Sequence, residues 1–313
     1  MKNVLLIMPD FFEYKELVIS ALMKKYNVIT VDEFKKSNFI RVTKKITNHY
    51  KKKLECYNDY LEEKMTESNY DVLFVIKGDN LNLKVLNDFK INNPNAKTIL
   101  YQWDSLLNYD YSHLLSFFDS TFTFDADDAL SLSINYLPLF FDEERKIQDK
   151  VDKKIDMLFV GSLHSHRYEL CQLLKTKYPD YNFVFLLYIS LFDYIKNAVF
   201  NFTFIPFKLI RFTPIKKDEM NNLISQSKAI LDIESSNQKG ITIRTFETLS
   251  LNVKLITTNK NILNIKGVSH SRFVVIDPLN PILDKSDFEG LPDGIVDNLS
   301  HYSIDNWLIN IGF

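Results

Sequence analysis

The sequence predicts an α/β protein with two doubly wound, Rossmann-like parallel β-sheets, one in each half of the chain. Short apolar runs such as Val4–Met8 and Asp71–Ile76 alternate with longer stretches of helical character such as Lys15–Lys25. A strand without polar alternation is typical of a parallel sheet that helices cover on both faces. The alternation occurs on either side of the charged run Asp142–Lys154, which is read as a linker or linker helix, and this indicates two domains.

The first half supplies an N-terminal domain, predicted to cover residues 1–145. Its further strands are predicted at Val28–Val31, Lys97–Tyr101, Ser120–Phe124 and Tyr136–Leu139, with a helix at Leu81–Phe89. The stretch Lys35–Lys64 is polar and rich in charge, so a helix on the surface of this domain is expected there.

The second half supplies a C-terminal domain, predicted to cover residues 146–313, with a tail that is able to pack back on the first domain. Its strands are predicted at Ile155–Val160, Asn182–Leu187, Ala229–Glu234, Lys254–Thr258 and Phe273–Ile276. Its helices are predicted at Arg167–Lys177, Lys217–Gln226 and Thr242–Leu251.

Composition narrows the class of protein. The chain has 313 residues, 46% hydrophobic and 25% charged, which is enough to bury sizeable cores. A formal net charge of −2 lacks the basic surplus that nucleic acid attracts, so no nucleic-acid partner is expected. Two cysteines without metal or redox spacing fit a reducing compartment, and no apolar run reaches the roughly 18 residues of a bilayer span. A cytoplasmic protein is therefore expected.

The stretch Leu186–Phe212 is unusual because it is rich in Phe, Ile, Leu and Tyr, with Lys196, Lys208 and Arg211 spread through it. One interpretation is an amphipathic insertion that lies on the inner face of the cytoplasmic membrane. The other is a pair of buried helices or a contact between two copies of the chain. The sequence leaves these alternatives open, and the oligomeric state with them.

The strongest chemical signal lies in the segment Ala229–Asn259. A buried strand is followed by a polar loop with Gln238 and Gly240, and a helix then begins near Thr242. Helix N-termini bind phosphates because they expose unpaired N–H groups and a positive dipole, and a glycine lets the backbone approach a ligand closely.

Two charged residues follow on that helix. Arg244 lies in its first turn and can pair with a diphosphate through two N–H groups. Glu247 is three residues on and shares a helix face with Arg244, and its carboxylate suits the hydroxyls of a ribose or sugar. The alternative is an ordinary Arg–Glu pair on the surface of a helix.

Several motifs carry a family resemblance. They include Leu231-Asp232-Ile233, Gln238, Gly240-Ile241-Thr242, Arg244-Thr245-Phe246-Glu247 and Lys254–Asn259 in the second half. Others along the chain are Tyr101–Ser105, Phe124-Asp125 with Tyr136-Leu137-Pro138, Asp156–Gly161 with His164 and Arg167, and Tyr302-Ser303-Ile304 with Trp307. Together they resemble the CgeB-like and lipopolysaccharide- or capsule-type bacterial glycosyltransferases of the GT-B fold.

This resemblance implies two Rossmann-like domains that face a cleft, with a nucleotide-sugar donor held in the second domain and no cofactor. The implied donor-binding residues are Gly161, Ser162, His164, Arg167, Gln238, Gly240, Thr242, Arg244 and Glu247. The two-glutamate pattern of many retaining GT-B enzymes would need a glutamate at position 240, where Gly240 stands. Retention and inversion therefore both stay open.

An inverting reaction would need a base from the first domain. The candidates are Asp10 and Glu13 after the first strand and Asp104 after the strand Lys97–Tyr101, with Asp79 as a further choice. The alternative for Asp104 is an N-cap and for Asp10 a turn residue. Asp125-Ala126-Asp127 matches a metal-binding string but is read as helix capping, so no metal is expected.

The predicted activity is transfer of a sugar from a nucleotide-sugar donor to a surface polysaccharide or a lipid-linked glycan. Two alternatives remain beside it. One is a nucleotide-sugar epimerase or hydrolase of the same fold, and the other is a catalytically inactive protein that keeps the fold and binds.

Overall fold

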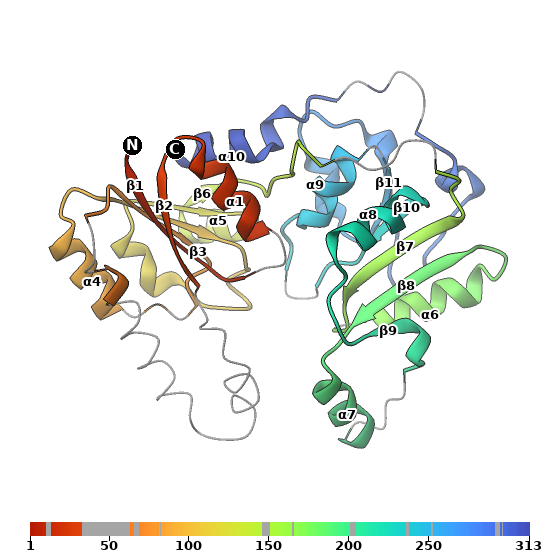
Figure 1. The fold of residues 1–313 in the computed structure, drawn as a ribbon. Coiled ribbons are helices and arrows are strands. Elements are labelled where there is room, and N and C mark those ends of the chain that lie inside the picture. The colour runs from red at the N-terminus through yellow and green to blue at the C-terminus, as the bar shows by residue number, and fades with distance from the viewer. Residues whose placement is uncertain are drawn as a thin grey trace. The chain divides into compact units, whose positions relative to one another are not determined.

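The computed structural model describes residues 1–10, 14–32, 63–65, 69–79, 81, 83–145, 151–164, 166–200, 205–235, 238–251, 253–291, 295 and 297–313. It divides into two compact units (Figure 1). Unit 1 comprises Met1–Pro138 and Ile304–Phe313, and unit 2 comprises Leu139–Ser303. The helix expected at Lys35–Lys64 lies outside the described residues except for Glu63 and Lys64.

Unit 1 holds a six-stranded sheet in which every pair of neighbouring strands is parallel. Its strands are β1 (Asn3–Met8), β2 (Asn27–Asp32), β3 (Val72–Ile76), β4 (Lys97–Gln102), β5 (Ser120–Thr123) and β6 (Asn135–Tyr136). Its helices are α1 (Tyr14–Met23), α4 (Leu83–Asn92), η1 (Ser112–Phe117), α5 (Ala126–Leu132) and α10 (Ile304–Ile311). The strand order is β2-β1-β3-β4-β5-β6.

The sheet of unit 1 is covered on both faces, which is why its central strands are apolar throughout. On one face Leu5 and Leu73 belong to a buried cluster that includes Phe89 of α4. On the other face Trp307 of α10 packs against Phe74 and Tyr101, with ring centroids 6.1 and 4.7 Å apart. The C-terminal helix is therefore part of the core of unit 1.

Unit 2 holds a second six-stranded sheet, also with parallel neighbours throughout. Its strands are β7 (Ile155–Ser162), β8 (Phe183–Tyr188), β9 (Ile210–Arg211), β10 (Ser227–Asp232), β11 (Lys254–Thr257) and β12 (Phe273–Val275). Its helices are α6 (Arg167–Lys177), α7 (Leu191–Phe200), α8 (Lys217–Ser225) and α9 (Ile243–Ser250), with short turns η2 (Phe207–Leu209), η3 (Lys260–Asn264), η4 (His270–Arg272), η5 (Lys285–Phe288) and η6 (Ser300–Tyr302). The strand order β12-β11-β10-β7-β8-β9 is that of a Rossmann sheet.

Successive residues of the strands in unit 2 point to opposite faces of the sheet and pack against different helices. Phe159 and Phe185 share a buried cluster with Leu174 of α6. Leu158 lies on the opposite face of the sheet, where it lines a pocket together with Met220 of α8. The doubly wound sheets that the sequence predicts are confirmed in both halves, because each sheet carries helices on its two faces.

Two segments of unit 2 lead to and from unit 1, and they run side by side. The backbone N–H of Phe141 donates to the carbonyl of Tyr302 at 2.9 Å, and Phe141 pairs with Ser303 in a parallel bridge. The run at Asp142–Lys154 begins immediately after this pairing. Nowhere in the described part of the chain is a helix both long enough and apolar enough to cross a bilayer.

Candidate functional site

Each sheet reverses its strand order at one point, and these points position the candidate site. The reversal lies between β1 and β3 in unit 1 and between β7 and β10 in unit 2. Ligands of open parallel sheets bind beyond the carboxyl ends of the strands at such a reversal, because neighbouring loops there turn to opposite faces.

Arg167, the first residue of α6, spans the reversal in unit 2. Its Nη1 donates to the carbonyl of Ser162 at the end of β7 (3.1 Å). Its Nε and Nη2 both donate to the carbonyl of Ile233 just beyond β10 (3.1 and 2.7 Å). Burial lowers the pKa of this guanidinium, and the carboxylate of Asp232 opposes that effect. Arg167 therefore ties two strand ends together with its own hydrogen bonds.

Three further predicted residues lie beside Arg167. A Cβ added to Gly161 would stand 2.7 Å from the Phe159 ring and 3.3 Å from Nη1 of Arg167, so the glycine makes room for both side chains. Ser162 is exposed, and His164 is exposed over part of its surface while neighbouring atoms shield the rest of its ring. Partial burial and the charge of Arg167 lower the pKa of His164 to about 4. Its neutral Nε2 lies 2.8 Å from Nη1 of Arg167 and accepts that hydrogen bond at neutral pH.

The loop that carries Gln238 and Gly240 is fixed by the residues after β11. Nδ2 of Asn259 donates to the carbonyls of Lys239 and Gly240, both at 3.2 Å. Nδ2 of Asn261 donates to the carbonyl of Lys239 at 2.9 Å. Gln238 closes a turn through its backbone N–H to the carbonyl of Ser235 (3.1 Å). The side chains of Asn259 and Asn261 thus hold the loop before α9 in place.

Thr242 is the N-cap residue of α9, but its hydroxyl does not cap the helix. The hydroxyl donates instead to Oδ2 of Asp232 at 2.9 Å. Burial raises the pKa of the Asp232 carboxyl, and the hydrogen bond from Thr242 opposes that rise. Position 242 therefore joins the start of α9 to the end of β10 and leaves the first turn of α9 without a cap from this side chain.

Glu247 of α9 lies between two arginines. Nη1 of Arg244 donates to one carboxylate oxygen at 2.5 Å, and Nη1 of Arg145 donates to the other. The side chains of Arg145, Glu247 and Arg244 are only 8%, 10% and 23% exposed, so the pair predicted on one helix face is not an ordinary surface pair. Nε of Arg145 also donates to Oδ1 of Asn221 on α8 at 3.0 Å.

Sequence reasoning missed Arg145, because it belongs to the charged run that was interpreted as a linker. Within that run it is the one arginine, beside acidic residues and lysines. No local spacing connects it to a helix that begins about a hundred residues later in the chain. Only the fold of unit 2 brings Arg145 to Glu247.

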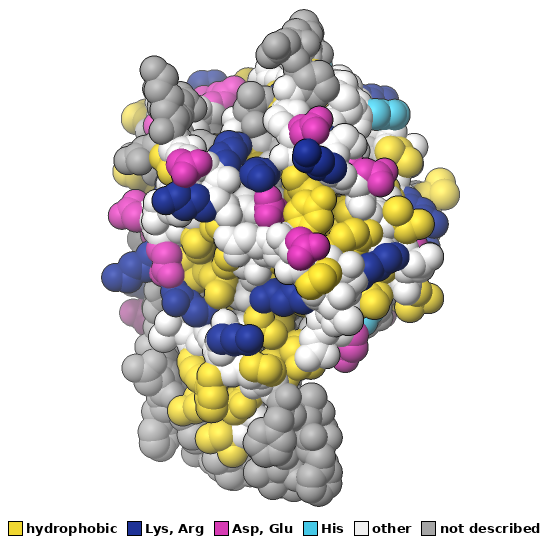
Figure 2. All heavy atoms as spheres, turned by 90° about the vertical axis from the view of Figure 1, so that its right-hand side faces the viewer, with side chains coloured by type: hydrophobic (Ala, Val, Ile, Leu, Met, Phe, Trp, Pro, Cys, Tyr) yellow, Lys and Arg dark blue, Asp and Glu magenta, His cyan; other side chains and the backbone are white. Residues whose placement is uncertain are grey.

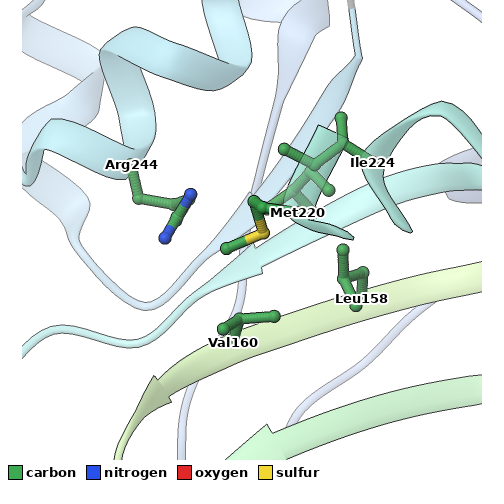
Figure 3. A pocket seen from close by; sticks show the side chains of 6 residues that line it. Leu158, Val160, Met220, Ile224 and Arg244 are labelled. Carbon is green, nitrogen blue, oxygen red and sulfur yellow. The ribbon is translucent and has the colours of Figure 1, made fainter. Parts of the chain in front are cut away.

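Arg244 also lines a small pocket over the sheet (Figure 3). In this view its guanidinium points toward Met220 and Val160. The remaining lining is the apolar set Leu158, Ile224 and Ile230. The pocket is small, with an empty volume of about 170 Å³, which is below the roughly 300–1,000 Å³ of a typical small-molecule site.

A second residue that sequence reasoning left unassigned is Glu234, just beyond the end of β10. Its side chain is half-buried, and its backbone N–H donates to Oγ1 of Thr258 at 3.2 Å. Burial and the charge of Asp232 raise the pKa of Glu234 to about 7. A carboxyl that titrates near neutral pH is suited to proton transfer, so this residue is a candidate acid or base.

The ends of β3 and β4 in unit 1 carry a cluster centred on Lys77. Its Nζ lies 2.5 Å from Oδ2 of Asp104 and 3.0 Å from Oδ2 of Asp79. Burial by itself lowers the pKa of Lys77, but hydrogen bonds and charges from the two aspartates raise it overall. Lys77 and Gly78 have φ of 78° and 79°, a left-handed conformation that is strained for a lysine. Nε2 of Gln102 donates to the carbonyl of Lys77 at 2.6 Å and helps to hold it.

The predicted bases have different surroundings in the structure. Asp104 is paired with Lys77 and is followed by a turn, so it does not cap a helix. Asp10 is exposed at the end of β1, and Glu13 lies outside the described residues. Asp125 caps α5 as predicted, since its side chain accepts from the backbone N–H of Asp127 at 3.0 Å. Among the described residues no three His, Cys, Asp or Glu side chains gather as a metal site requires.

Comparisons with known proteins bear on the fold. No protein-family model matches the chain, and neither does any curated protein. Among solved structures a UDP-N-acetylglucosamine 2-epimerase matches with a TM-score of 0.53 and 9% identity, over 99% of this chain and 94% of its own. The UDP-GlcNAc 2-epimerase from Neisseria meningitidis, solved bound to UDP-GlcNAc, matches with a TM-score of 0.51 and 12% identity over 99% of each chain.

The lipopolysaccharide outer core galactosyltransferase WaaB, in its apo form, also matches, over 82% of this chain and 80% of its own, at 12% identity. Its TM-score of 0.48 is too low to bear on the fold. The two epimerase structures span the whole chain, and at 9% and 12% identity they establish a common fold and nothing finer. The chain has the GT-B fold.

Proposed function

We propose that this chain is a nucleotide-sugar enzyme, and specifically a glycosyltransferase that moves a sugar from a nucleotide-sugar donor to a surface polysaccharide or a lipid-linked glycan. The observation that carries the proposal is the Arg145–Glu247–Arg244 cluster. Two arginines on one glutamate give this cluster a net positive charge, and its residues are largely buried. Such a charge favours an anionic ligand, because it costs free energy to hold a charge away from water.

A nucleoside diphosphate has the chemistry that this cluster would recognise. Arg244 comes from the first turn of α9, and this helix follows the carboxyl end of β10 in the chain, so its N-terminal N–H groups belong to the same end of the sheet. A diphosphate there would receive charge from Arg244 and from the helix end. The same groups would stabilise the diphosphate as it leaves, which is the main catalytic requirement of glycosyl transfer. The exposed Ser162 and His164 are positioned to contribute polar contacts.

The acceptor would be served by unit 1 in this proposal. Asp104 and Asp79 surround one lysine at the ends of β3 and β4, so the cluster offers carboxylates that accept hydrogen bonds from sugar hydroxyls. Asp104 remains the proposed base of unit 1, and Glu234 is the candidate acid or base of unit 2. Transfer without a metal or a cofactor is part of the proposal.

A second candidate function has one specific observation in its favour. At least three solved structures that match over nearly the whole chain with a TM-score above 0.5 are described as UDP-N-acetylglucosamine 2-epimerases. An epimerase inverts one carbon of the sugar and needs no acceptor. A transferase consumes the donor productively only when an acceptor is present.

The test is a thermal-shift screen of the full chain against UDP-, GDP-, CMP- and dTDP-sugars. A ligand that binds only the folded state raises the apparent melting temperature. The donor that binds is then incubated with and without oligosaccharide acceptors, and the products are separated. Conversion of the free donor to its epimer supports the second candidate. If none of the four classes binds, both enzyme proposals fail and a binding protein that keeps the fold is left.

A further inference from the structure

Unit 2 exposes a group of large apolar side chains on α7 and on the turn η2. Leu191, Phe192 and Ile195 of α7 are 56%, 50% and 53% exposed, and Phe207 of η2 is 68% exposed. On a helix, positions i, i+1 and i+4 lie on one side, so the three α7 residues form a single stripe. We call these four residues the α7 surface. Such exposure excludes a pair of buried helices at these positions.

The α7 surface is anchored to the buried core of unit 2. Tyr194, on the inner side of α7, is buried and donates its hydroxyl to the carbonyl of Ile205 at 3.2 Å. The ring of Phe207 lies 5.4 Å from that of Tyr194 and 6.2 Å from that of Phe212, between centroids. Because the inner rings fix Phe207, little conformational entropy is lost when its outer side is covered.

Positive charge accompanies this apolar surface. Lys208 follows Phe207 and is exposed. Burial and the charge of Lys208 both lower the pKa of Lys175 on α6, which requires the two ammonium groups to lie near each other. In Figure 2 hydrophobic side chains gather at the level where Figure 1 draws α7, with lysine and arginine side chains above them.

Two acidic groups of these elements have partners within unit 2. Glu219 of α8 pairs with Arg211 of β9. Asp193 of α7 accepts a hydrogen bond from the hydroxyl of Ser190 at 2.5 Å, and its backbone N–H donates to the same hydroxyl at 3.1 Å. The Asp193 carboxylate keeps its charge, and Lys175 and Lys208 outnumber it beside the apolar stripe.

We propose that the α7 surface docks unit 2 on a lipid bilayer that contains anionic lipids. Apolar side chains that enter the headgroup region, flanked by lysines that meet anionic headgroups, are the combination that binds a helix parallel to a membrane. A second copy of the chain fits the surface less well. A two-fold contact through α7 would bring the lysine pair of one copy to that of the other, and like charges repel.

This inference does not depend on the proposed enzymatic function, because no donor-site residue belongs to the α7 surface. Docking on the membrane would bring the chain close to a glycan acceptor that is attached to a lipid. Membrane binding and nucleotide-sugar binding can therefore fail separately, and each is measured without the other.

The experiment is flotation of the full chain with vesicles of phosphatidylcholine alone and of phosphatidylcholine with phosphatidylglycerol. The wild-type chain is expected to float with the anionic vesicles. The double variant Phe192→Ser/Phe207→Ser should lower its partition coefficient at least about tenfold, because two large apolar side chains no longer enter the interface. Lys208→Gln should lower partitioning about fivefold on anionic vesicles and leave it unchanged on phosphatidylcholine.

Leu130→Ser is the matched control, since Leu130 is an exposed leucine (84%) on helix α5 of unit 1. It should float as the wild-type chain does. The proposal is overturned if the wild-type chain does not prefer anionic vesicles, or if Leu130→Ser loses as much binding as the double variant. It is also overturned if ultracentrifugation shows a dimer that Phe192→Ser/Phe207→Ser dissociates. Lys208→Gln, at an exposed position, keeps the test decisive if the double variant does not fold.

Discussion

The two sheets end in opposite arrangements of charge. In unit 1 one cation, Lys77, lies between the carboxylates of Asp79 and Asp104. In unit 2 one anion, Glu247, lies between the guanidinium groups of Arg145 and Arg244. Two units with related topology therefore offer a net negative cluster and a net positive cluster. The difference teaches that two related sheets can carry opposite charge at their ends, because sheet topology does not determine which residues are placed there.

The two arrangements also differ in how they are held. The unit 1 cluster is built on a strained turn, in which both Lys77 and Gly78 have positive φ. The unit 2 cluster uses ordinary helical backbone, and its precision comes from side chains of distant segments such as Arg145.

The largest effect is expected from Glu247→Gln. This change leaves the guanidinium groups of Arg145 and Arg244 without the carboxylate between them, and breaking a buried ion pair in this way costs about 3–5 kcal/mol. Chemical denaturation measures the loss in the free energy of unfolding. Glu219→Gln is the control, because Glu219 is 43% exposed in its pair with Arg211 and exposed pairs contribute about 0–1 kcal/mol. Equal losses in the two variants would contradict the assigned role of Glu247.

The next effect is on binding, and it is measured separately from the stability that is lost when Glu247 keeps only Arg145 as a partner. Arg244→Ala removes the cation that is proposed to hold the donor diphosphate, and a hydrogen bond to a charged group is worth about 1.5–3 kcal/mol, or roughly 10–150-fold in affinity. Calorimetric titration with the donor that the thermal-shift screen identifies measures the loss. Lys217→Ala removes an exposed cation whose Nζ lies 3.8 Å from Oδ2 of Asp142 in the same unit, and it should bind as the wild-type chain does. Normal sugar transfer by Arg244→Ala would refute the donor site.

A pH effect is expected at Glu234. The pKa of this carboxyl rises from 4.5 to about 7 on folding, so the unfolded chain releases the proton first as the pH increases. A raised carboxyl pKa makes folding less favourable as the pH rises from about 4.5 through about 7. Glu234→Gln should therefore be more stable than the wild-type chain at pH 8, by about 1–3 kcal/mol, and gain little at pH 4. A stability difference that does not change with pH would show that Glu234 does not titrate in this range.

The smallest effect is expected at the strained turn of unit 1. Gly78→Ala places a Cβ at positive φ, 3.1 Å from Cγ1 of Val75, and should cost about 1–2 kcal/mol in the free energy of unfolding. Gly290→Ala is the matched control, because nothing lies within 4 Å of a Cβ there and its φ is not in the positive region. We expect this control to change the stability by less than about 1 kcal/mol. A loss of the same size in both variants would remove the case for strain at Lys77 and Gly78.

The sequence was most informative where one short segment contains both the element and its neighbours. The apolar runs located the strands well because a buried parallel strand leaves no polar position inside it. It was weaker at the edges of the sheets. The strand expected at Tyr136–Leu139 is only Asn135–Tyr136, and β9 was not predicted, because an edge strand of two residues has no periodicity to detect.

In the candidate site, too, the contacts between residues close in sequence were predictable and those between distant segments were not. The pairing of Arg244 with Glu247 follows from helical spacing, and the capping by Asp125 follows from its place before a helix. Arg145 on Glu247 depends on long-range packing, as do Arg167 on the carbonyl of Ile233 and the lysine between two aspartates. No spacing in the chain predicts the contacts of Arg145 with Glu247, of Arg167 with Ile233 or of Lys77 with Asp104, since these partners are far apart in the sequence and meet only in the folded unit.

By itself the sequence determined the fold class, the positions of the central strands, and the segment after β10 as the place to look for an anion site. These properties are local, because they depend on periodicity and on residues that follow one another. Only the tertiary structure decided that Glu247 carries two arginines, that Lys77 holds Asp104, and that α7 presents its apolar stripe outward. These depend on which distant segments the sheet order brings together, and strand order is set by the packing of whole elements.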